Sequence, residues 1–252
     1  MTIPLQRGIV YGPVNSRRLG LSLGINVLPT RQKVCSLNCL YCQYGWTKFH
    51  TRLLTQREFL PTVPEILRAV EESLQMVYPQ PAYITFSGNG EPTLHPNFPE
   101  LVAGVIRLRD RYAPSARTAV LSNSTRIDDA RIRDAIEQLD MRIMKLDCGN
   151  GVCFQSFNRP APGINFETIV HWLMAMRGIT IQSLFTGGPQ GNYSPDNIRD
   201  WINIVKEISP RAVQIYTLDR GYPAKSITPA TPEMLKHLKK RLQSEGIEGE
   251  VY

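Results

Sequence analysis

The sequence predicts an α/β fold, specifically a partial (β/α)6 TIM-type barrel formed by a single domain. Short apolar runs alternate with amphipathic stretches from about residue 61 onward. This alternation is typical of parallel strands joined by right-handed helical crossovers. A chain of 252 residues is long enough for one large α/β domain. Because six strand–helix units are fewer than the eight of a closed barrel, we expect the barrel to be open.

The strands and helices are expected in strict alternation. The predicted strands cover residues 21–29, 82–88, 116–124, 141–147, 179–185 and 211–219. The predicted helices cover residues 61–77, 96–112, 128–139, 165–178, 194–208 and 231–246. Asp128 is the expected N-cap of the third helix, and Gly178 is the expected C′ glycine of the fourth. The predicted domain spans 1–252, with an N-terminal extension over about 1–20, six strands over 21–218, and a C-terminal helix and tail over 219–252.

Polar or glycine-rich segments follow every predicted strand. In chain order they are KVCSLNCLYC, SGNGEPTLHP, SNST, KLDCGNGVC, TGGPQGNYS and YTLDRGYP. The carboxyl ends of parallel strands meet at one rim of the sheet, and the loops at that rim carry the chemistry in barrels of this type. The sequence therefore predicts one functional site at that rim.

Composition and charge are those of a soluble protein. Apolar residues make up 42% and charged residues 20%, and the sequence contains neither a membrane-spanning apolar run nor the apolar core of a secretory signal. We expect a cytoplasmic location, where clustered cysteines more often bind metal or take part in catalysis than form disulfides. The net charge of +7 favours an anionic partner such as nucleic acid, although a solvated basic surface explains it equally well.

Three of the five cysteines lie within eight positions, as Cys35, Cys39 and Cys42 in the spacing C-x3-C-x2-C. Cysteine thiolates bind soft metals, and sites made of sulfur usually hold zinc or an iron–sulfur cluster. Structural zinc typically takes four ligands from two C-x2-C halves. Here only one such half is present, and His50 is the alternative fourth ligand. Three thiolates suit a 4Fe-4S cluster that leaves one iron open to a ligand from outside the protein.

The segment is similar to C-x3-C-x-aromatic-C, the signature of the radical S-adenosylmethionine (radical SAM) superfamily, with Tyr41 as the aromatic residue. The six-unit partial barrel also resembles that superfamily's architecture, and the resemblance covers nearly the whole chain. It implies that Cys35, Cys39 and Cys42 bind three irons, that S-adenosylmethionine chelates the fourth, and that Tyr41 lies near the adenine. One electron from the cluster would then cleave S-adenosylmethionine to a 5′-deoxyadenosyl radical that abstracts hydrogen from a substrate.

The segment Gly88-Asn89-Gly90-Glu91 resembles the superfamily's GGE motif, whose backbone binds the methionyl amino group. The chemistry is reasonable, because an ammonium group needs acceptors and glycines let carbonyl groups approach closely. A tight glycine turn after a strand is the alternative.

Further cofactor contacts are implied at the ends of the later strands. Ser122 and Asn123 are expected at the ribose, although such residues also form turns. Lys145 and Asp147 share one face of their strand, so they either bind the carboxylate of the cofactor or substrate or form a buried ion pair. The remaining expected contacts are Gln182 or Ser183, and Tyr216 and Leu218.

Two further cysteines and two arginines have alternative assignments. Cys148 and Cys153 follow the fourth strand; they are either inert buried thiols or include a catalytic thiol at Cys148, with Lys145 as a second catalytic candidate. Two cysteines are too few for a second 4Fe-4S cluster. Arg17 and Arg18 either bind a phosphate or carboxylate of the substrate or form surface salt bridges.

The segments GPVNSRRLGLSLGINVLP, SGNGEPTLHP and NRP (158–160) resemble the group loosely related to tRNA wyosine-base synthesis enzymes. This implies a small-molecule or nucleotide substrate, with tRNA as one possibility, and an electron donor such as flavodoxin or ferredoxin. The alternative is a non-catalytic iron–sulfur or zinc protein that serves as an electron carrier or RNA-binding module.

Overall fold

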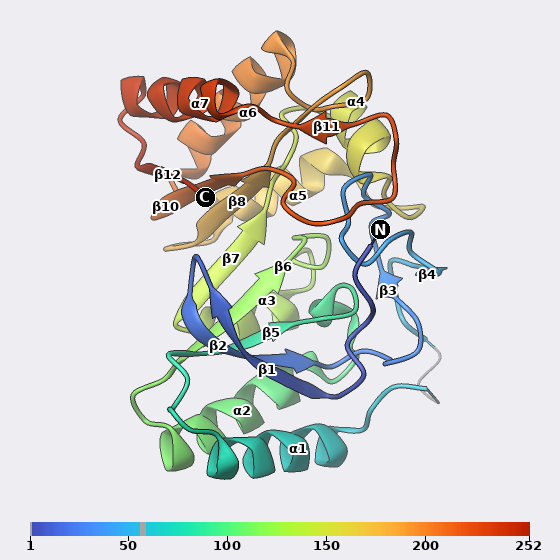
Figure 1. Ribbon diagram of the computed structural model, residues 1–252, viewed down its shortest axis with the longest axis vertical. Helices are drawn as coiled ribbons and strands as arrows, with labels where there is room; N and C mark the ends of the chain where they lie inside the picture. Colours follow the sequence, from blue (N-terminus) through green and yellow to red (C-terminus); the bar gives the residue numbers. More distant parts are fainter. Residues whose placement is uncertain (1, 56–58) are drawn as a thin grey trace.

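The computed structural model describes residues 2–55 and 59–252. Within these residues, the central sheet has eight strands in the order β1-β2-β5-β6-β7-β8-β10-β12, with helices covering its outer face (Figure 1). The six predicted strands are present as parallel neighbours: β2 (Gly20–Asn26), β5 (Tyr83–Ser87), β6 (Arg117–Ser122), β7 (Met141–Lys145), β8 (Thr180–Leu184) and β10 (Ala212–Tyr216). The predicted α/β fold with an open, partial barrel is confirmed.

Every predicted helix is present after its strand. The helices are α1 (Val63–Met76), α2 (Phe98–Tyr112), α3 (Ala130–Glu137), α5 (Phe166–Ala175), α6 (Pro195–Ile208) and α7 (Pro232–Ser244). Their sequences explain their starts, since α1, α6 and α7 each have a capping Ser or Thr and a proline at the first or second helical position. In α6, Ile198, Trp201 and Val205 are buried at helical spacing, which fixes that helix against the sheet.

Two edge strands lie in the segments predicted as extension and tail. β1 (Val10–Ser16) pairs antiparallel with β2, and β12 (Gly249–Val251) pairs parallel with β10. The interior of β1 contains Gly12 and Pro13, and its register shifts between Tyr11 and Val14. Proline and glycine inside a strand are typical of edges and bulges, and β12 has only three residues, so neither strand has a recognisable alternating pattern.

Two predicted helix ends were wrong. The N-cap of α3 is Asp129, whose carboxylate accepts a hydrogen bond from the Arg131 backbone N–H at 3.0 Å, whereas Asp128 forms an ion pair with Arg52. Helix α5 ends earlier than predicted, at the C-cap Met176, and Gly178 lies two residues beyond it with φ of +63°. Adjacent aspartates offer the same capping chemistry, so the sequence alone does not separate them.

Short elements complete the fold at the rim where the parallel strands end. They are β3 (Val34–Cys35), β4 (Phe49–His50), η1 (Pro92–Leu94), α4 (Gly151–Cys153), η2 (Phe154–Asn158), β9 (Thr186–Gly187) and β11 (Thr228–Pro229). β3 and β4 pair with each other beside the cysteine loop. No helix among the described residues has both the length and the apolar character needed to cross a membrane.

Candidate cluster and cofactor site

The cysteine loop is held on both sides by backbone hydrogen bonds. On one side, the Val34 N–H donates to the Asn89 carbonyl and the Glu91 N–H donates to the Val34 carbonyl, each at 3.1 Å. On the other side, the Leu40 N–H donates to the Phe157 carbonyl at 3.0 Å, and Leu37 forms a β-bridge with Pro160. The loop is therefore fixed between the glycine motif after β5 and the residues at the end of η2.

The three cysteine side chains have little exposure to solvent. Cys35 and Cys39 are each 9% exposed, and Cys42 is half-buried. Burial raises the pKa of the Cys35 thiol to about 12 and that of Cys39 to about 11. Without a metal both are neutral thiols at physiological pH, whereas metal coordination deprotonates a thiol outright. Cluster binding should therefore release protons.

Three polar side chains surround the thiols. The Asn123 amide donates to Cys35 Sγ at 3.5 Å, and the Asn158 amide donates to Cys39 Sγ at 3.4 Å. Lys33 is buried, and its Nζ donates to the Gly45 carbonyl at 2.8 Å. Burial works to lower the pKa of Lys33, but the nearby cysteine thiols outweigh burial and raise it. These N–H groups and this cation suit sulfur ligands that carry negative charge.

The possible metal ligands named from sequence are the three thiols of the loop and His50. Among residues 2–55 and 59–252, no three histidine, cysteine, aspartate or glutamate side chains converge as ligands of one metal ion. His50, the alternative zinc ligand, has its Nε2 3.2 Å from the Ser36 carbonyl oxygen. In a 4Fe-4S cluster each thiolate binds a different iron, so the three sulfurs need not meet at one point. The residues present therefore fit a cluster with three protein ligands.

Gly90 is required for the packing of the cysteine loop. Its φ is +144°, and an added Cβ would lie 1.7 Å from the Val34 carbonyl oxygen. Gly88 has φ of +110°, and its Cβ would lie 2.7 Å from Asn26. Gly90 therefore serves the close backbone approach that places the motif beside Cys35, and Gly88 leaves room for the Asn26 side chain.

Replacing Gly90 with alanine should destabilise the protein. The strained φ alone costs about 1–3 kcal/mol, and the clash with Val34 adds to it. Urea unfolding of the metal-free protein measures the loss. Gly20→Ala is the control, because Gly20 also has positive φ, +67°, but an added Cβ meets nothing within 4 Å. Equal losses in the two variants would contradict the close-approach role of Gly90.

The side chains of Asn89 and Glu91 are used inside the protein. The buried Asn89 amide exchanges two hydrogen bonds with the Gln6 backbone, at 2.8 and 2.9 Å, and donates to the Pro29 carbonyl. The buried Glu91 carboxylate accepts from the Ser122 hydroxyl at 2.9 Å and from the Asn123 N–H at 2.6 Å. Burial raises the pKa of Glu91, although these hydrogen bonds oppose the rise. Glu91 thus joins the ends of β5 and β6.

Ser122 and Asn123, the predicted ribose contacts, already have protein partners. The Ser122 hydroxyl, besides donating to Glu91, accepts from the Ser124 N–H at 3.1 Å. The Asn123 side chain donates to Ser36 Oγ at 2.9 Å and accepts from Thr125. Ser122 is fully buried and Asn123 partly exposed, so Asn123 is the more accessible of the two.

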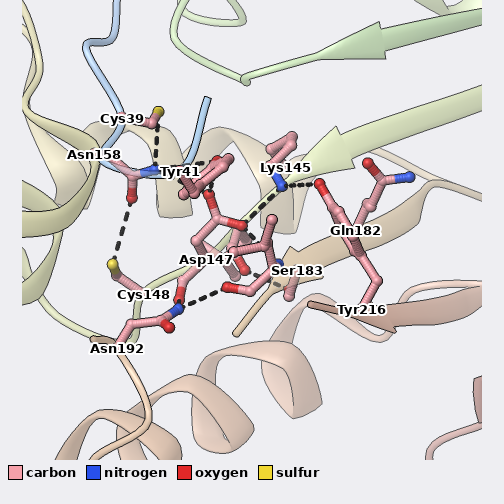
Figure 2. A network of polar contacts seen from close by, with 12 residues as sticks. Cys39, Tyr41, Lys145, Asp147, Cys148, Asn158, Gln182, Ser183, Asn192 and Tyr216 are labelled. Carbon is pink, nitrogen blue, oxygen red and sulfur yellow. Dashed lines mark hydrogen bonds and ion pairs between the residues drawn. The ribbon is translucent and has the colours of Figure 1, made fainter. Parts of the chain in front are cut away.

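Lys145 and Asp147 form an ion pair at 2.9 Å in the middle of the polar network in Figure 2. Asp147 is 3% exposed and also accepts hydrogen bonds from the Tyr41 hydroxyl, the Asn158 amide at 2.9 Å and the Leu184 N–H at 2.9 Å. The ion pair considered from sequence is therefore present. It also links the aromatic residue of the cysteine motif to strands β7 and β8.

The Lys145 ammonium lies against two aromatic rings. Its Nζ donates to the Tyr216 hydroxyl at 2.8 Å, and the ring centroids of Tyr41 and Tyr216 are 5.0 and 4.8 Å away. Burial works to lower the pKa of Lys145, but Asp147 and Tyr216 outweigh burial and raise it. Lys145 is therefore a cation at physiological pH, and two of its three N–H groups are used.

The two alternatives on β8 point to opposite faces of the sheet. The Ser183 hydroxyl donates to the Leu146 carbonyl and accepts from the Trp201 indole N–H at 3.1 Å, so it points toward α6 on the outside. Gln182 pairs in register with Lys145 and donates to Gln214 at 2.8 Å. Gln182 therefore lies on the same face of the sheet as Lys145. Of the two residues, it is the better placed for contact with the cofactor. Leu218 is half-buried beyond the end of β10.

The two arginines before β2 have different surroundings. Arg17 forms an exposed ion pair with Asp219 at 2.7 Å, which is the surface salt bridge considered from sequence. The Arg18 guanidinium lies 4.5 Å from the centroid of the Tyr216 ring, and its Nη1 is buried without a hydrogen-bond partner. Arg18 is therefore close to the Lys145 network, and Arg17 is not part of it.

Comparison with known proteins agrees with this geometry. The sequence profile of the Radical SAM superfamily matches residues 30–145, which include the cysteine loop and the glycine motif. A UPF0026 protein of Methanocaldococcus jannaschii is 32% identical over 233 residues, covering 90% of this chain and 68% of the relative. The chain belongs to the radical SAM superfamily. A Brachyspira hyodysenteriae protein named GTPase Obg is 30% identical over 93% of this chain, and the chain spans only 33% of its length.

Solved radical SAM structures share the fold. A radical SAM methyltransferase from Sphaerobacter thermophilus superposes with a TM-score of 0.67 at 15% identity, over 92% of this chain and 65% of that one. A structure of TYW1 with a lysine-pyruvate adduct gives a TM-score of 0.58 at 16% identity, over 88% and 73%. At such identities the likeness shows the fold alone. Radical SAM enzymes use a 4Fe-4S cluster and S-adenosylmethionine as cofactors, and Streptococcus suis SuiB, which shares the fold at 10% identity, has been solved with bound S-adenosylmethionine.

Sequence reasoning missed Lys33 and Asn158 as parts of this site. Lys33 precedes the cysteine motif by two residues. A cation so close to a metal-binding loop indicates a residue that can contact the sulfur ligands. Asn158 belongs to the segment NRP, which was noticed only as a family resemblance. Its place beside Cys39 depends on the tertiary pairing of residues 157–160 with the cysteine loop, for which the sequence gives no local pattern.

Proposed function

We propose that this protein is an enzyme in which Cys35, Cys39 and Cys42 hold a 4Fe-4S cluster whose fourth iron binds S-adenosylmethionine. The observation that carries the proposal is the cysteine loop itself, in which amide donors meet the sulfurs of Cys35 and Cys39 and which the glycine motif holds in place. With both groups bound, the cluster supplies the electron that cleaves S-adenosylmethionine to methionine and a 5′-deoxyadenosyl radical.

The protein's contribution is to bind and orient S-adenosylmethionine and to exclude water. The backbone of Gly88, Asn89, Gly90 and Glu91 takes the methionyl ammonium, and Asn123, with Ser122 behind it, lies on the ribose side. Tyr41, Tyr216 and Leu218 supply the apolar contacts to the adenine. On β8, Gln182 rather than Ser183 contacts the cofactor, because the Ser183 side chain faces α6.

Lys145 and Asp147 place a fixed ion pair in the interior. The Lys145 ammonium has one N–H beyond those used by Asp147 and Tyr216, and this N–H is directed to a carboxylate of the cofactor or the substrate. Asp147 holds Lys145 charged and fixes the Tyr41 ring through its hydroxyl. Lys145 and Cys148 are the two candidates for a direct part in the chemistry of the substrate.

The proposed substrate is a small molecule or a modified nucleotide, including a tRNA base, from which the radical takes hydrogen. The net charge of +7 and the unpartnered Arg18 Nη1 beside Tyr216 support an anionic substrate. A flavodoxin or ferredoxin is the proposed electron donor, and the cytoplasm, with its reduced thiols, is the proposed location.

The experiment is to reconstitute the anaerobic protein with iron and sulfide, reduce it with dithionite and add S-adenosylmethionine. We expect a brown protein that forms 5′-deoxyadenosine and methionine in equal amounts. Incubation with cell extract and labelled S-adenosylmethionine then identifies the metabolite or RNA that changes mass. A colourless protein that binds one zinc ion and forms no 5′-deoxyadenosine would overturn the proposal in favour of a non-catalytic module.

A further inference from the structure

All five cysteines of the chain gather at one end of the sheet, and two of them form a pair outside the cysteine loop. Cys148 lies three residues beyond the end of β7, and Cys153 ends the short helix α4. The Cys153 thiol donates to Cys148 Sγ, and the two sulfurs are 2.7 Å apart. The two sulfur atoms of a disulfide are about 2.05 Å apart. The two side chains therefore already point at each other, and only a small movement separates them from bonding distance.

The loop that joins the two cysteines is fixed independently of any bond between them. The Asn150 side chain caps α4 by accepting from the Cys153 N–H at 2.9 Å, and it donates to Asp200 at 2.9 Å. The Gly149 N–H donates to Asn197 Oδ1 at 2.7 Å. A Cβ on Gly149 would lie 2.1 Å from the Trp201 backbone nitrogen. The loop is thus clamped against α6 and presents the two sulfurs to each other.

The two thiols differ in access to solvent. Cys148 is 1% exposed, and its S–H donates to Asn158 Oδ1 at 3.4 Å. Cys153 is half-buried, and its neighbour Val152 is 83% exposed, so α4 lies at the surface. A soluble reagent can therefore meet Cys153 first, and Cys148 can react only with Cys153. Redox-sensing cysteines often lie next to a second, resolving thiol. Burial raises the pKa of Cys148 well above its ordinary value, so Cys148 is a neutral thiol until it gives up its proton in the reaction.

We propose that Cys148 and Cys153 form a redox-active dithiol that reacts with low-molecular-weight disulfides. The Cys153 thiolate attacks one sulfur of the external disulfide, which forms a mixed disulfide and releases one thiol. Cys148 then attacks Cys153 Sγ and its proton passes to the departing thiolate, so that the internal disulfide forms, the Cys153–external sulfur bond breaks and the second thiol leaves. The protein pair is oxidised by two electrons, and the external disulfide is reduced to two thiols.

The dithiol is connected to the cluster loop through Asn158. This side chain accepts from Cys148 and donates to both Cys39 Sγ and Asp147 (Figure 2). Closing the internal disulfide removes the S–H that Asn158 accepts. Oxidation of the pair therefore changes the hydrogen bonding of Asn158, which also contacts the cluster loop and Asp147 of the ion pair.

The test uses the anaerobic cluster-loaded protein in glutathione buffers of increasing disulfide content, followed by alkylation and peptide mass analysis. We expect both cysteines of the 148–153 segment to become unreactive together, with the peptide losing two hydrogens and carrying no glutathione. Cys148→Ser should instead accumulate a glutathione adduct on Cys153. Cys153→Ser should leave Cys148 free to be alkylated after denaturation in every buffer.

Two results would overturn the proposal. One is a wild-type protein in which Cys153 carries glutathione while Cys148 stays free, because the pair then does not close. The other is a wild-type protein in which both thiols remain alkylatable across the whole series. The mass readout is specific to this segment and independent of iron, so its outcome is separate from that of the cluster assignment.

Discussion

Replacing Cys39 with alanine is expected to abolish stable binding of the 4Fe-4S cluster and with it all formation of 5′-deoxyadenosine. Cys39 is the middle ligand of the proposed three, and its sulfur lies beside the Asn158 amide. Two thiolates are too few to hold three irons. We expect the reconstituted variant to contain little iron or sulfide and to lack the brown absorption, as measured by chemical analysis and visible spectroscopy.

The matched control is Cys153→Ala, which removes a half-buried cysteine outside the loop. It should bind as much iron as the wild type after reconstitution. Circular dichroism of both metal-free variants checks that each is folded. Iron content in Cys39→Ala equal to that of the control would contradict the assignment of Cys39 as a ligand.

Replacing Asp147 with alanine is expected to cause the largest loss of stability away from the cysteine loop. The change leaves the Lys145 ammonium without its counter-ion and the Tyr41 hydroxyl and the Leu184 N–H without their acceptor. It also removes one of the acceptors of the Asn158 amide. Removing one member of a buried ion pair costs about 3–5 kcal/mol. Urea unfolding of the metal-free protein measures the change in the free energy of unfolding.

Two further variants separate the reasons for this loss. Asp147→Asn keeps the shape and one acceptor oxygen, so its loss should be smaller than that of Asp147→Ala. Lys206→Ala removes an ion pair between exposed side chains, Lys206 and Glu245, and should hardly change stability. If Asp147→Ala were as stable as Lys206→Ala, the network in Figure 2 would not hold the interior together.

The six parallel strands and their helices could be predicted from sequence because apolar runs and amphipathic stretches alternate there without interruption. The predicted rim was also confirmed, since strand direction alone brings the six loops to one edge. The edge strands were missed for a physical reason. β1 forms because it pairs with β2, although it contains Gly12 and Pro13. β12 has too few residues for a periodic pattern in the sequence.

Within the site, the spacing of residues along one segment determines some contacts, and the packing of distant segments determines the others. Lys145 and Asp147 lie two apart on one strand, and they do form a pair. Ser183 and Gln182 differ by one position, which reverses the face of the sheet. Asn158 and Lys33 reach the thiols only because distant segments pack on the cysteine loop, so their roles follow from the structure.

The most direct test of the open iron is Mössbauer spectroscopy of protein reconstituted with isotopically enriched iron, recorded with and without S-adenosylmethionine. Three thiolate ligands leave one iron of the cluster without a protein sulfur. We predict that one quarter of the iron signal changes on addition of S-adenosylmethionine, while the other three quarters stay as they were. A spectrum in which all four irons are equivalent and insensitive to S-adenosylmethionine would contradict the account.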